Sequence, residues 1–371
     1  MYTVLRRIYY GDDVLFDVQQ DTLLLRLTAA QIRTMGEAQF DNIIIARNGA
    51  VRTRSGCAKI PVIHRAGYPL IRVYDNQRNG RYYGGNTNKF GITYKDKNYI
   101  VKFPKDEDLS VWTEYIASSF IRALSIPCQV TKLGMYKGEF VVLVEDFTTP
   151  TCVLHAYKET QQSSEESDIQ TKDYTYHDVL YLIDKHLKMT AQEKQRAKIQ
   201  FWNMFICDAI LGNRDRHWGN WGYFAQEMGY TIAPIFDNGG SLFPGVAKVL
   251  GIYKDANARA AFLRERIFTF PASLFKMEQF EARSKRTNYY EMLGCTEFDP
   301  IFESCVQQMR KKFTLQQVYQ AIKGVVKDLP ISSTLKRFYI EIVVLRYACI
   351  IQRAQFDEVY PKVEELIWKR K

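Results

Sequence analysis

The spacing of apolar residues changes after residue 148, and this change most constrains the fold. Before it, short apolar runs such as TVLRRIYY, FGITY and NYIVKF alternate with turn signals, a pattern typical of strands. From about residue 177 onward, apolar residues recur at helical spacing, as in AQEKQRAKIQFWNMFICDAILGN, which should end at Gly212. The sequence therefore predicts an α+β protein in which a β-rich half precedes a helical half.

Three parts follow from this pattern. Residues 1–76 are interpreted as a small β-rich N-terminal extension, whose role the sequence does not indicate. Residues 77–148 contain a glycine-bearing loop, a hairpin, the helix LSVWTEYIASSFIRALS and the buried strand GEFVVLVEDF. Residues 149–371 are expected to be mainly helical, except for a polar segment at 158–174 that we interpret as a mobile surface insertion. The length of 371 residues allows one two-lobed domain with an ample core.

The formal charge of +10 favours an anionic partner, such as an acidic protein, a nucleic acid, a membrane surface or a phosphate-bearing ligand. Because the basic residues are scattered, direct binding of nucleic acid is not expected. We find no signal peptide and no membrane-spanning run, so the cytoplasm is the default compartment. The 7 cysteines contain no C-x-x-C pair, which argues against a disulfide framework or a zinc site.

Four polar features form one coherent site if their chemistry is phosphoryl transfer. Lys102 lies in the strand YIVKF, where Val101 and Phe103 would point to the opposite face. Glu114 lies on the helix just downstream and could hold the lysine by a charge-assisted hydrogen bond. A strand lysine paired with a helix glutamate positions the phosphates of a nucleotide in protein kinases.

The third feature is the turn GNRDRHWGNW, in which Asp215 and Asn220 have the D-x-x-x-x-N spacing of a kinase catalytic loop. The fourth is Asp237 in IFDNGG, whose carboxylate could bind the same magnesium ion as Asn220. Each feature alone has an ordinary interpretation as a surface residue or a turn. Their order along the chain is the kinase order, and an ordered set of four is much rarer by chance than any one member.

The segment GNRDRHWGNWGYF, followed by IAPIFDNGGSLF, resembles the catalytic and metal-binding segments of HipA-type serine/threonine kinases, especially the shorter CtkA-like branch. RNGRYYGGNTNKFGITYKDKNYIVKFPK and EYIASSFIRAL resemble that branch's nucleotide loop, lysine strand and glutamate helix. The resemblance covers about residues 77–360. It implies a two-lobed protein-kinase-like fold with a β-rich N-lobe and a helical C-lobe.

The resemblance also implies a role for each feature. Asp215 would be the catalytic base, and His217 would either lie near the phosphates or support the loop. Asn220 and Asp237 would bind Mg²⁺. The loop GGNTNKFG offers Thr87 and no serine, so Thr87 is the candidate for autophosphorylation. The residues expected to bind ATP are Lys102, Glu114, Gly84, Gly85, Glu145 and Phe147.

The implied reaction is transfer of the ATP γ-phosphoryl group to a protein serine or threonine, by a toxin or an effector. Gly84, Gly85 and Gly91 would let backbone N–H groups approach the phosphates. The expected partners are a protein substrate of unknown identity and a candidate antitoxin or regulatory protein. Two alternatives stay open: a pseudokinase-like basic binding module, and a phosphoinositide-type lipid kinase with a related D-x-x-x-x-N and D-x-G arrangement. A metal-hydrolase interpretation of Asp215 and His217 is the weakest, because the sequence has no second histidine at ligand spacing.

Overall fold

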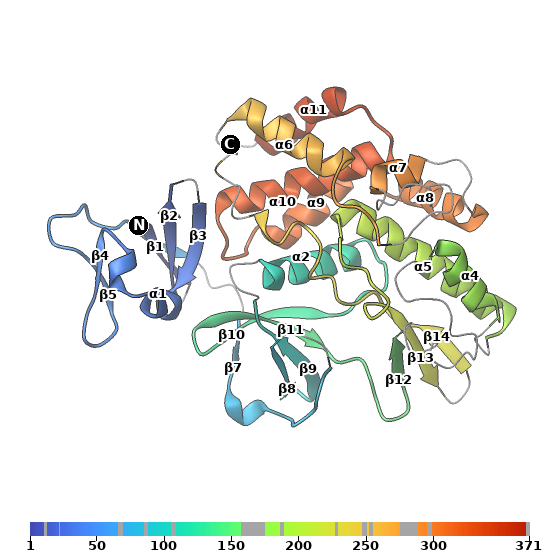
Figure 1. The fold of residues 1–371 in the computed structure, drawn as a ribbon, viewed down its shortest axis with the longest axis horizontal. Coiled ribbons are helices and arrows are strands. Elements are labelled where there is room, and N and C mark those ends of the chain that lie inside the picture. Colours follow the sequence, from blue (N-terminus) through green and yellow to red (C-terminus); the bar gives the residue numbers. More distant parts are fainter. Residues whose placement is uncertain are drawn as a thin grey trace.

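The computed structural model describes residues 1–10, 13–21, 23–65, 70–84, 88–104, 109–156, 175–185, 189–226, 229–246, 251, 255–274, 288–294 and 299–368. Gly85, Thr87 and the polar segment 158–174 lie outside the described residues. Strands dominate the first part of the chain and helices the second (Figure 1). The predicted change from a β-rich half to a helical half is therefore confirmed.

The main sheet is built from two hairpins and a parallel edge strand. Its order is β7-β10-β11-β9-β8. The strands are β7 (Ile71–Val73), β8 (Lys89–Tyr94), β9 (Lys97–Lys102), β10 (Thr131–Tyr136) and β11 (Glu139–Glu145). The predicted hairpin is thus β8–β9, and the predicted buried strand is β11. The division of the chain at residues 76 and 148 stays a prediction, but β7, which precedes residue 77, pairs with β10.

Helix α2 (Ser110–Ala123) covers one face of the main sheet, and the rings of Trp112 and Phe140 meet there at 4.8 Å. Because side chains alternate along a strand, Ile100 and Lys102 of β9 share one face, while Tyr99 and Val101 join a separate core cluster on the other. The predicted helix over this segment is confirmed. Lys102 consequently lies on the face of the sheet that α2 covers.

The second half of the chain is a helical bundle with a small sheet at its edge. The helices are α4 (Tyr176–Lys185), α5 (Ala191–Leu211), α6 (Ala256–Phe268), α7 (Tyr289–Gly294), α8 (Pro300–Lys312), α9 (Leu315–Val326), α10 (Ser333–Arg346) and α11 (Phe356–Trp368). A π-helical turn, Tyr347–Ile351, follows α10. The small sheet has the order β12-β13-β14, with β12 (Val153–Ala156), β13 (Gly222–Gln226) and β14 (Gly229–Ile232).

Helix α5 leads directly into the candidate catalytic turn. Thr190 caps its N-terminus in a capping box with Glu193. Gly212 ends it in the left-handed conformation, with φ of 63°, as the sequence predicted. The turn therefore lies between the buried end of α5 and the start of β13. Helix α9 packs against α2 and so links the helical bundle to the main sheet (Figure 1).

The N-terminal extension has its own sheet and core. The sheet order is β3-β2-β1-β6, from β1 (Thr3–Tyr10), β2 (Asp13–Gln20), β3 (Leu23–Thr28) and β6 (Val62–Arg65). A hairpin of β4 (Ile43–Ile45) and β5 (Val51–Thr53) and a short helix, α1 (Ala29–Met35), complete it. Val4, Phe16, Val18 and Ile32 belong to a core cluster separate from that of the bundle.

The extension packs against both other parts of the chain. Ile8 and Leu15 belong to the main core cluster. Arg26, which pairs with Asp17, donates Nη1 to the Ile331 carbonyl at 2.6 Å, next to α10. A side chain at Gly138, in the β10–β11 turn, would meet Ala30 Cβ at 2.6 Å. The close packing of the extension on the other two parts was not predicted from the sequence.

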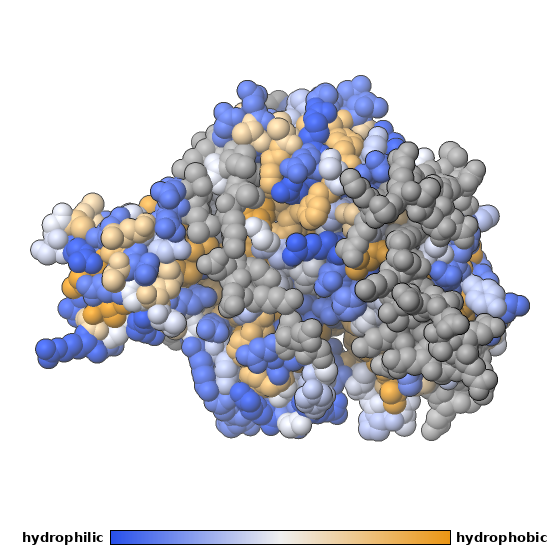
Figure 2. Space-filling model, in the orientation of Figure 1, coloured by the Kyte–Doolittle hydropathy of each residue, from blue (hydrophilic) through white to orange (hydrophobic). Residues whose placement is uncertain are grey.

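The residues that Figure 2 colours by hydropathy include both hydrophilic and hydrophobic ones on this face of the molecule. Such a mixture is normal for a protein surface exposed to water. No helix in the described ranges is long and apolar enough to cross a membrane.

Candidate active site

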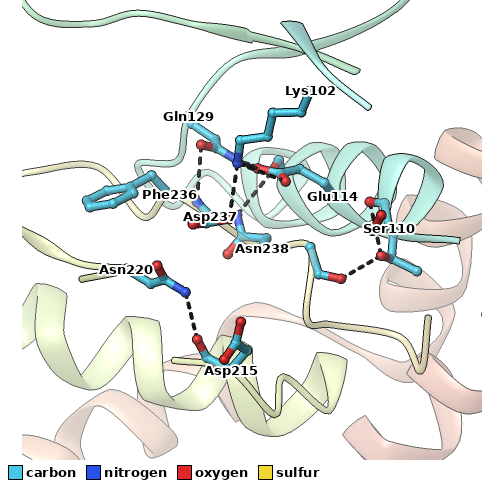
Figure 3. Close-up of polar contacts among 12 residues, drawn as sticks. Lys102, Ser110, Glu114, Gln129, Asp215, Asn220, Phe236, Asp237 and Asn238 are labelled. Carbon is cyan, nitrogen blue, oxygen red and sulfur yellow. Dashed lines mark hydrogen bonds and ion pairs between the residues drawn. The ribbon is translucent and has the colours of Figure 1, made fainter. Parts of the chain in front are cut away.

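Lys102, Glu114 and Asp237 converge where the main sheet meets the helical bundle (Figure 3). Lys102 Nζ lies 2.9 Å from Glu114 Oε1, 3.0 Å from Glu114 Oε2 and 3.1 Å from Asp237 Oδ1. The Lys102 side chain is only 15% exposed and that of Glu114 only 5%. The structure thus brings together three of the residues singled out in the sequence, from β9, α2 and the loop after β14.

Gln129 fixes this cluster, and the sequence reasoning missed it. Its Nε2 donates to Glu114 Oε1 at 2.7 Å and to Ser118 Oγ at 3.1 Å. Its Oε1 accepts from the Asp237 backbone N–H at 3.2 Å. Gln129 therefore couples the helix glutamate to the aspartate loop. A polar residue between α2 and an apolar strand gave only a weak signal, because its partners come from distant segments.

The charges of the cluster support one another. Burial of the Lys102 ammonium opposes its charge, but Asp237 and Glu114 outweigh that effect and raise the pKa of Lys102. Desolvation of the Asp237 carboxyl opposes its ionisation, but Lys102 and Arg216 hold its pKa below the usual value. Both groups are consequently charged at neutral pH. Asp237 has a φ of 55°, a left-handed conformation that aspartate adopts more readily than most residues.

The turn GNRDRHWGNW holds Asp215 and Asn220 side by side. The Asp215 backbone N–H donates to Asn213 Oδ1 at 3.0 Å, and Asn220 Nδ2 donates to the Asp215 carbonyl at 2.7 Å. The Asp215 side chain is exposed, whereas Asn220 is buried. His217 is also exposed, and its Nδ1 accepts from the Gly219 N–H at 3.0 Å. The turn therefore presents a carboxylate and an imidazole to the solvent side of the site.

Arg216 is a fully buried cation behind this turn. It forms a bidentate pair with Asp208 of α5, with Nε–Oδ2 at 2.8 Å and Nη2–Oδ1 at 2.9 Å. Nη1 donates to the carbonyls of Asn220 and Phe236, and Nη2 donates to Asn238 Oδ1 at 2.6 Å. Arg216 thus joins the catalytic turn to the loop that carries Asp237. The sequence signal was the lone aspartate in the apolar run FICDAIL, because a buried carboxylate needs a partner.

Gly240 allows the two loops to approach closely. A Cβ at this position would lie 2.6 Å from Asp215 Cβ and 2.9 Å from Asn213 Oδ1, which is closer than real contacts permit. Any side chain at Gly240 must therefore displace Asp215. Close packing against Asp215 and Asn213 therefore explains the second glycine of IFDNGG, which the sequence alone did not explain.

We expect Gly240→Ala to lower any turnover that depends on Asp215 by about 100-fold, because a displacement of about 1 Å has an effect of this size. The measurement is steady-state turnover at saturating ATP. Gly245→Ala is the matched control, because a Cβ there would meet no atom of the described residues within 4 Å. Equal rates for the two variants would show that the position of Asp215 does not limit turnover.

The segment after β11 joins the two halves of the chain beside this site. Glu145 Oε1 pairs with Lys97 Nζ at 2.6 Å. The Phe147 ring meets Phe224 of β13 at 5.3 Å and Phe236 at 6.0 Å. Gly84 is exposed, and a Cβ there would meet nothing within 4 Å among the described residues. Their proposed contacts with ATP stay predictions.

The residues present fit a magnesium ion. Asn220 uses Nδ2 to hold the Asp215 carbonyl, which leaves Oδ1 as its ligand atom. The lowered pKa of Asp237 keeps its carboxylate charged. Over the described ranges, no group of three or more His, Cys, Asp or Glu side chains could hold a metal ion by itself. Mg²⁺ does not need such a group, because it binds through one or two protein ligands together with waters and substrate phosphates.

These observations define a protein-kinase-like domain, in which a β-rich lobe carries a lysine–glutamate pair and a helical lobe carries the D-x-x-x-x-N turn. Residues 82–313 match the family described as "HipA-like C-terminal domain". This match covers more than half of the chain, so the chain belongs to that family. The predicted family and fold class are thereby confirmed.

Proteins named CtkA from Helicobacter pylori are similar to this chain. The chain is 36% identical over 228 residues to the serine/threonine-protein kinase CtkA of Helicobacter pylori strain J99, an alignment that covers 57% of this chain and 66% of that protein. It therefore spans slightly less than two thirds of the curated relative. The crystal structure of a proinflammatory kinase CtkA from H. pylori matches with a TM-score of 0.65 and 29% identity, over 80% of this chain and 99% of that chain. HipA in a complex with HipB and operator DNA from Shewanella oneidensis MR-1 matches with a TM-score of 0.48 and 15% identity, over 78% of this chain and 68% of that chain.

Proposed function

We propose that the protein is an ATP- and Mg²⁺-dependent protein serine/threonine kinase. The observation that carries this proposal is the ion-pair cluster of Lys102 with Glu114 and Asp237, in one site with Asp215 and Asn220. The name of the relative from H. pylori, a serine/threonine-protein kinase, supports the same chemistry. A pseudokinase-like binding module is less favoured, because this set of five residues is intact, whereas a degenerate kinase usually loses one of them.

In the proposed reaction, the acceptor hydroxyl attacks the γ-phosphorus of ATP, and the bond between that phosphorus and the β–γ bridging oxygen breaks, which releases ADP. Asp215 accepts the hydroxyl proton. Lys102, held by Glu114, contacts the phosphates. His217, two residues after Asp215, would lie near the same phosphates. Asn220 and Asp237 would hold Mg²⁺, which neutralises charge on the phosphate oxygens. Most of the rate enhancement comes from positioning and electrostatics.

The partners in this proposal are a protein substrate and an antitoxin or other regulatory protein. The chain would act as a toxin or an effector, in the bacterial cytoplasm or in the cytosol of a host. Thr87, outside the described residues, is the proposed site of autophosphorylation. These assignments rest on the family resemblance and on the residues quoted for it.

The test is incubation with Mg²⁺ and γ-labelled ATP, side by side with a bacterial protein extract and with phosphoinositide vesicles. The proposal requires labelled protein. Label in lipid alone would identify a phosphoinositide-type lipid kinase. The absence of both label and ATP binding would favour the binding module. Intact mass of the wild type and of Thr87→Ala would show whether Thr87 itself is labelled.

Lys89 adds a pH dependence to this site. It lies directly opposite Lys102 in the β8–β9 pair. Partial burial and the charge of Lys102 lower the pKa of Lys89. As pH rises, Lys89 therefore loses its charge at a lower pH than an ordinary lysine, whose pKa is about 10.4. Lys102, whose pKa is raised, is still charged at that pH.

We expect ATP binding to weaken as pH rises through the lowered pKa of Lys89, because a positive charge beside the phosphates is lost. Lys89→Arg should move this loss to higher pH, since the guanidinium group stays protonated. The measurement is the Kd for ATP between neutral pH and about pH 10. An identical pH profile for the wild type and Lys89→Arg would exclude Lys89 from the phosphate site.

A further inference from the structure

Tyr83 occupies an unusual place on the main sheet. Gly91 of β8 has no side chain, and a Cβ there would lie 2.9 Å from Tyr83 Cε2 and 2.3 Å from Asn79 Oδ1. The Asn79 backbone N–H donates to the Gly91 carbonyl at 3.1 Å, so the segment before the nucleotide loop runs along β8. Gly91 is therefore needed where a tyrosine ring and an amide lie directly on the strand.

This face of the strand is the one that faces the site. Gly91 pairs with Ile100 of β9, and Ile100 pairs with Val144 of β11. Lys102 lies two residues beyond Ile100, on the same face and about 7 Å along the strand. Tyr83 thus lies over the strand position two residues from Lys102, on the side toward the segment that follows β11.

Tyr83 is also tied to that segment. Its OH donates to Asp146 Oδ2 at 2.8 Å, and Arg81 Nη1 donates to the same oxygen at 2.8 Å. Thr148 donates its N–H and its hydroxyl to Asp146 Oδ1, at 3.0 and 2.6 Å. The Asp146 side chain is only 3% exposed. Burial and the negative charge of Asp146 raise the pKa of Tyr83, so the phenol stays a hydrogen-bond donor.

We propose that Tyr83 is a base-contacting residue, whose ring covers the purine of the bound nucleotide from the side of the main sheet. The inference rests on the proposed function. Aromatic surface on the other side comes from Phe147, in the segment that follows β11, and from the two rings that it contacts, Phe224 and Phe236. Phe236 lies next to Asp237 in the sequence. A purine placed between these groups would contact aromatic rings while its phosphates extend toward Lys102. Asp146 acts through Tyr83 and is a positioning residue.

Binding of adenosine and of Mg²⁺·ATP to Tyr83→Ala tests the inference, because adenosine carries the base without phosphates. We expect the Kd for both ligands to rise by the same factor, about tenfold, as for loss of a stacked aromatic contact. Tyr83→Phe keeps the ring and loses the bond to Asp146, so its Kd values should fall between those of the wild type and Tyr83→Ala. Tyr82→Ala is the control, because Tyr82 is 93% exposed, and it should bind both ligands as the wild type does.

Four results would overturn the inference. Weaker binding of ATP with unchanged adenosine binding would mean that Tyr83 acts on the phosphate loop. Tighter binding of both ligands by Tyr83→Ala would mean that the ring fills the place of the base, and unchanged binding would mean that it does not touch the base. If the wild type binds neither ligand, the nucleotide site itself is wrong, which would refute the proposed function as well.

Discussion

We expect Asp215→Asn to lower the rate of phosphoryl transfer by about 10²- to 10⁴-fold, the usual contribution of a general base. Asparagine has nearly the same size but cannot accept the hydroxyl proton. The Asp215 side chain is exposed, and the turn is held by the Asp215 backbone N–H and carbonyl, which the substitution keeps. We therefore expect the fold and the affinity for Mg²⁺·ATP to remain those of the wild type.

Three measurements on the same preparation separate these effects: turnover, the Kd for ATP and the thermal unfolding midpoint. The control is Asp184→Asn on α4, which replaces another partly exposed aspartate, 47% exposed and paired with Lys198. It should change none of the three. Wild-type turnover in Asp215→Asn would remove Asp215 from the mechanism.

Arg216→Met should reduce the free energy of unfolding by about 3–5 kcal/mol, the cost of removing one partner of a buried ion pair. Among the described residues, the substitution leaves the buried Asp208 carboxylate with the Asn213 amide as its remaining donor, with Nδ2 2.9 Å from Oδ1. It also releases the carbonyls of Asn220 and Phe236 and the Asn238 amide, which Arg216 holds. Arg216→Lys should recover only part of the loss, because an ammonium cannot form the bidentate pair.

Urea unfolding of Arg216→Met, Asp208→Leu and the double variant isolates the pair. The double variant should be less destabilised than the sum of the two single variants, since neither charge is then left buried alone. The control is Arg214→Met, two residues earlier and exposed, which should change the free energy of unfolding by less than about 0.5 kcal/mol. A similarly small change for Arg216→Met would mean that the buried pair does not hold the two loops.

Local patterns predicted the elements that carry the site. Helical periodicity located α2 and α5, glycine chemistry located the end of α5 at Gly212, and alternation with turn residues located the β8–β9 hairpin. These features depend on neighbours within a few residues, so a sequence displays them directly. The order of Lys102, Glu114, Asp215 and Asp237 then suggested that distant segments meet, although no local signal reports the distances.

The residues that hold the site together could not be found in this way. Gln129 contacts the Asp237 backbone across 108 residues of sequence, and Arg216 contacts Asn238 across 22. Tyr83 reaches Asp146 across 63 residues. Such contacts depend on how segments distant in the sequence pack together, and a polar residue in a loop looks the same whether it faces water or a partner. The packing of the extension through Ile8 and Arg26 is missing from the sequence analysis for the same reason.

The most direct test of the central claim is the rate of γ-phosphoryl transfer from ATP to protein by the wild type, Asp215→Asn and Asp237→Asn, at equal Mg²⁺ and ATP. We predict transfer by the wild type alone, at a rate that depends on Mg²⁺, while Asp215→Asn still binds Mg²⁺·ATP. Transfer by Asp237→Asn at the wild-type rate, or a wild type that binds Mg²⁺·ATP and labels no protein, would contradict the assignment.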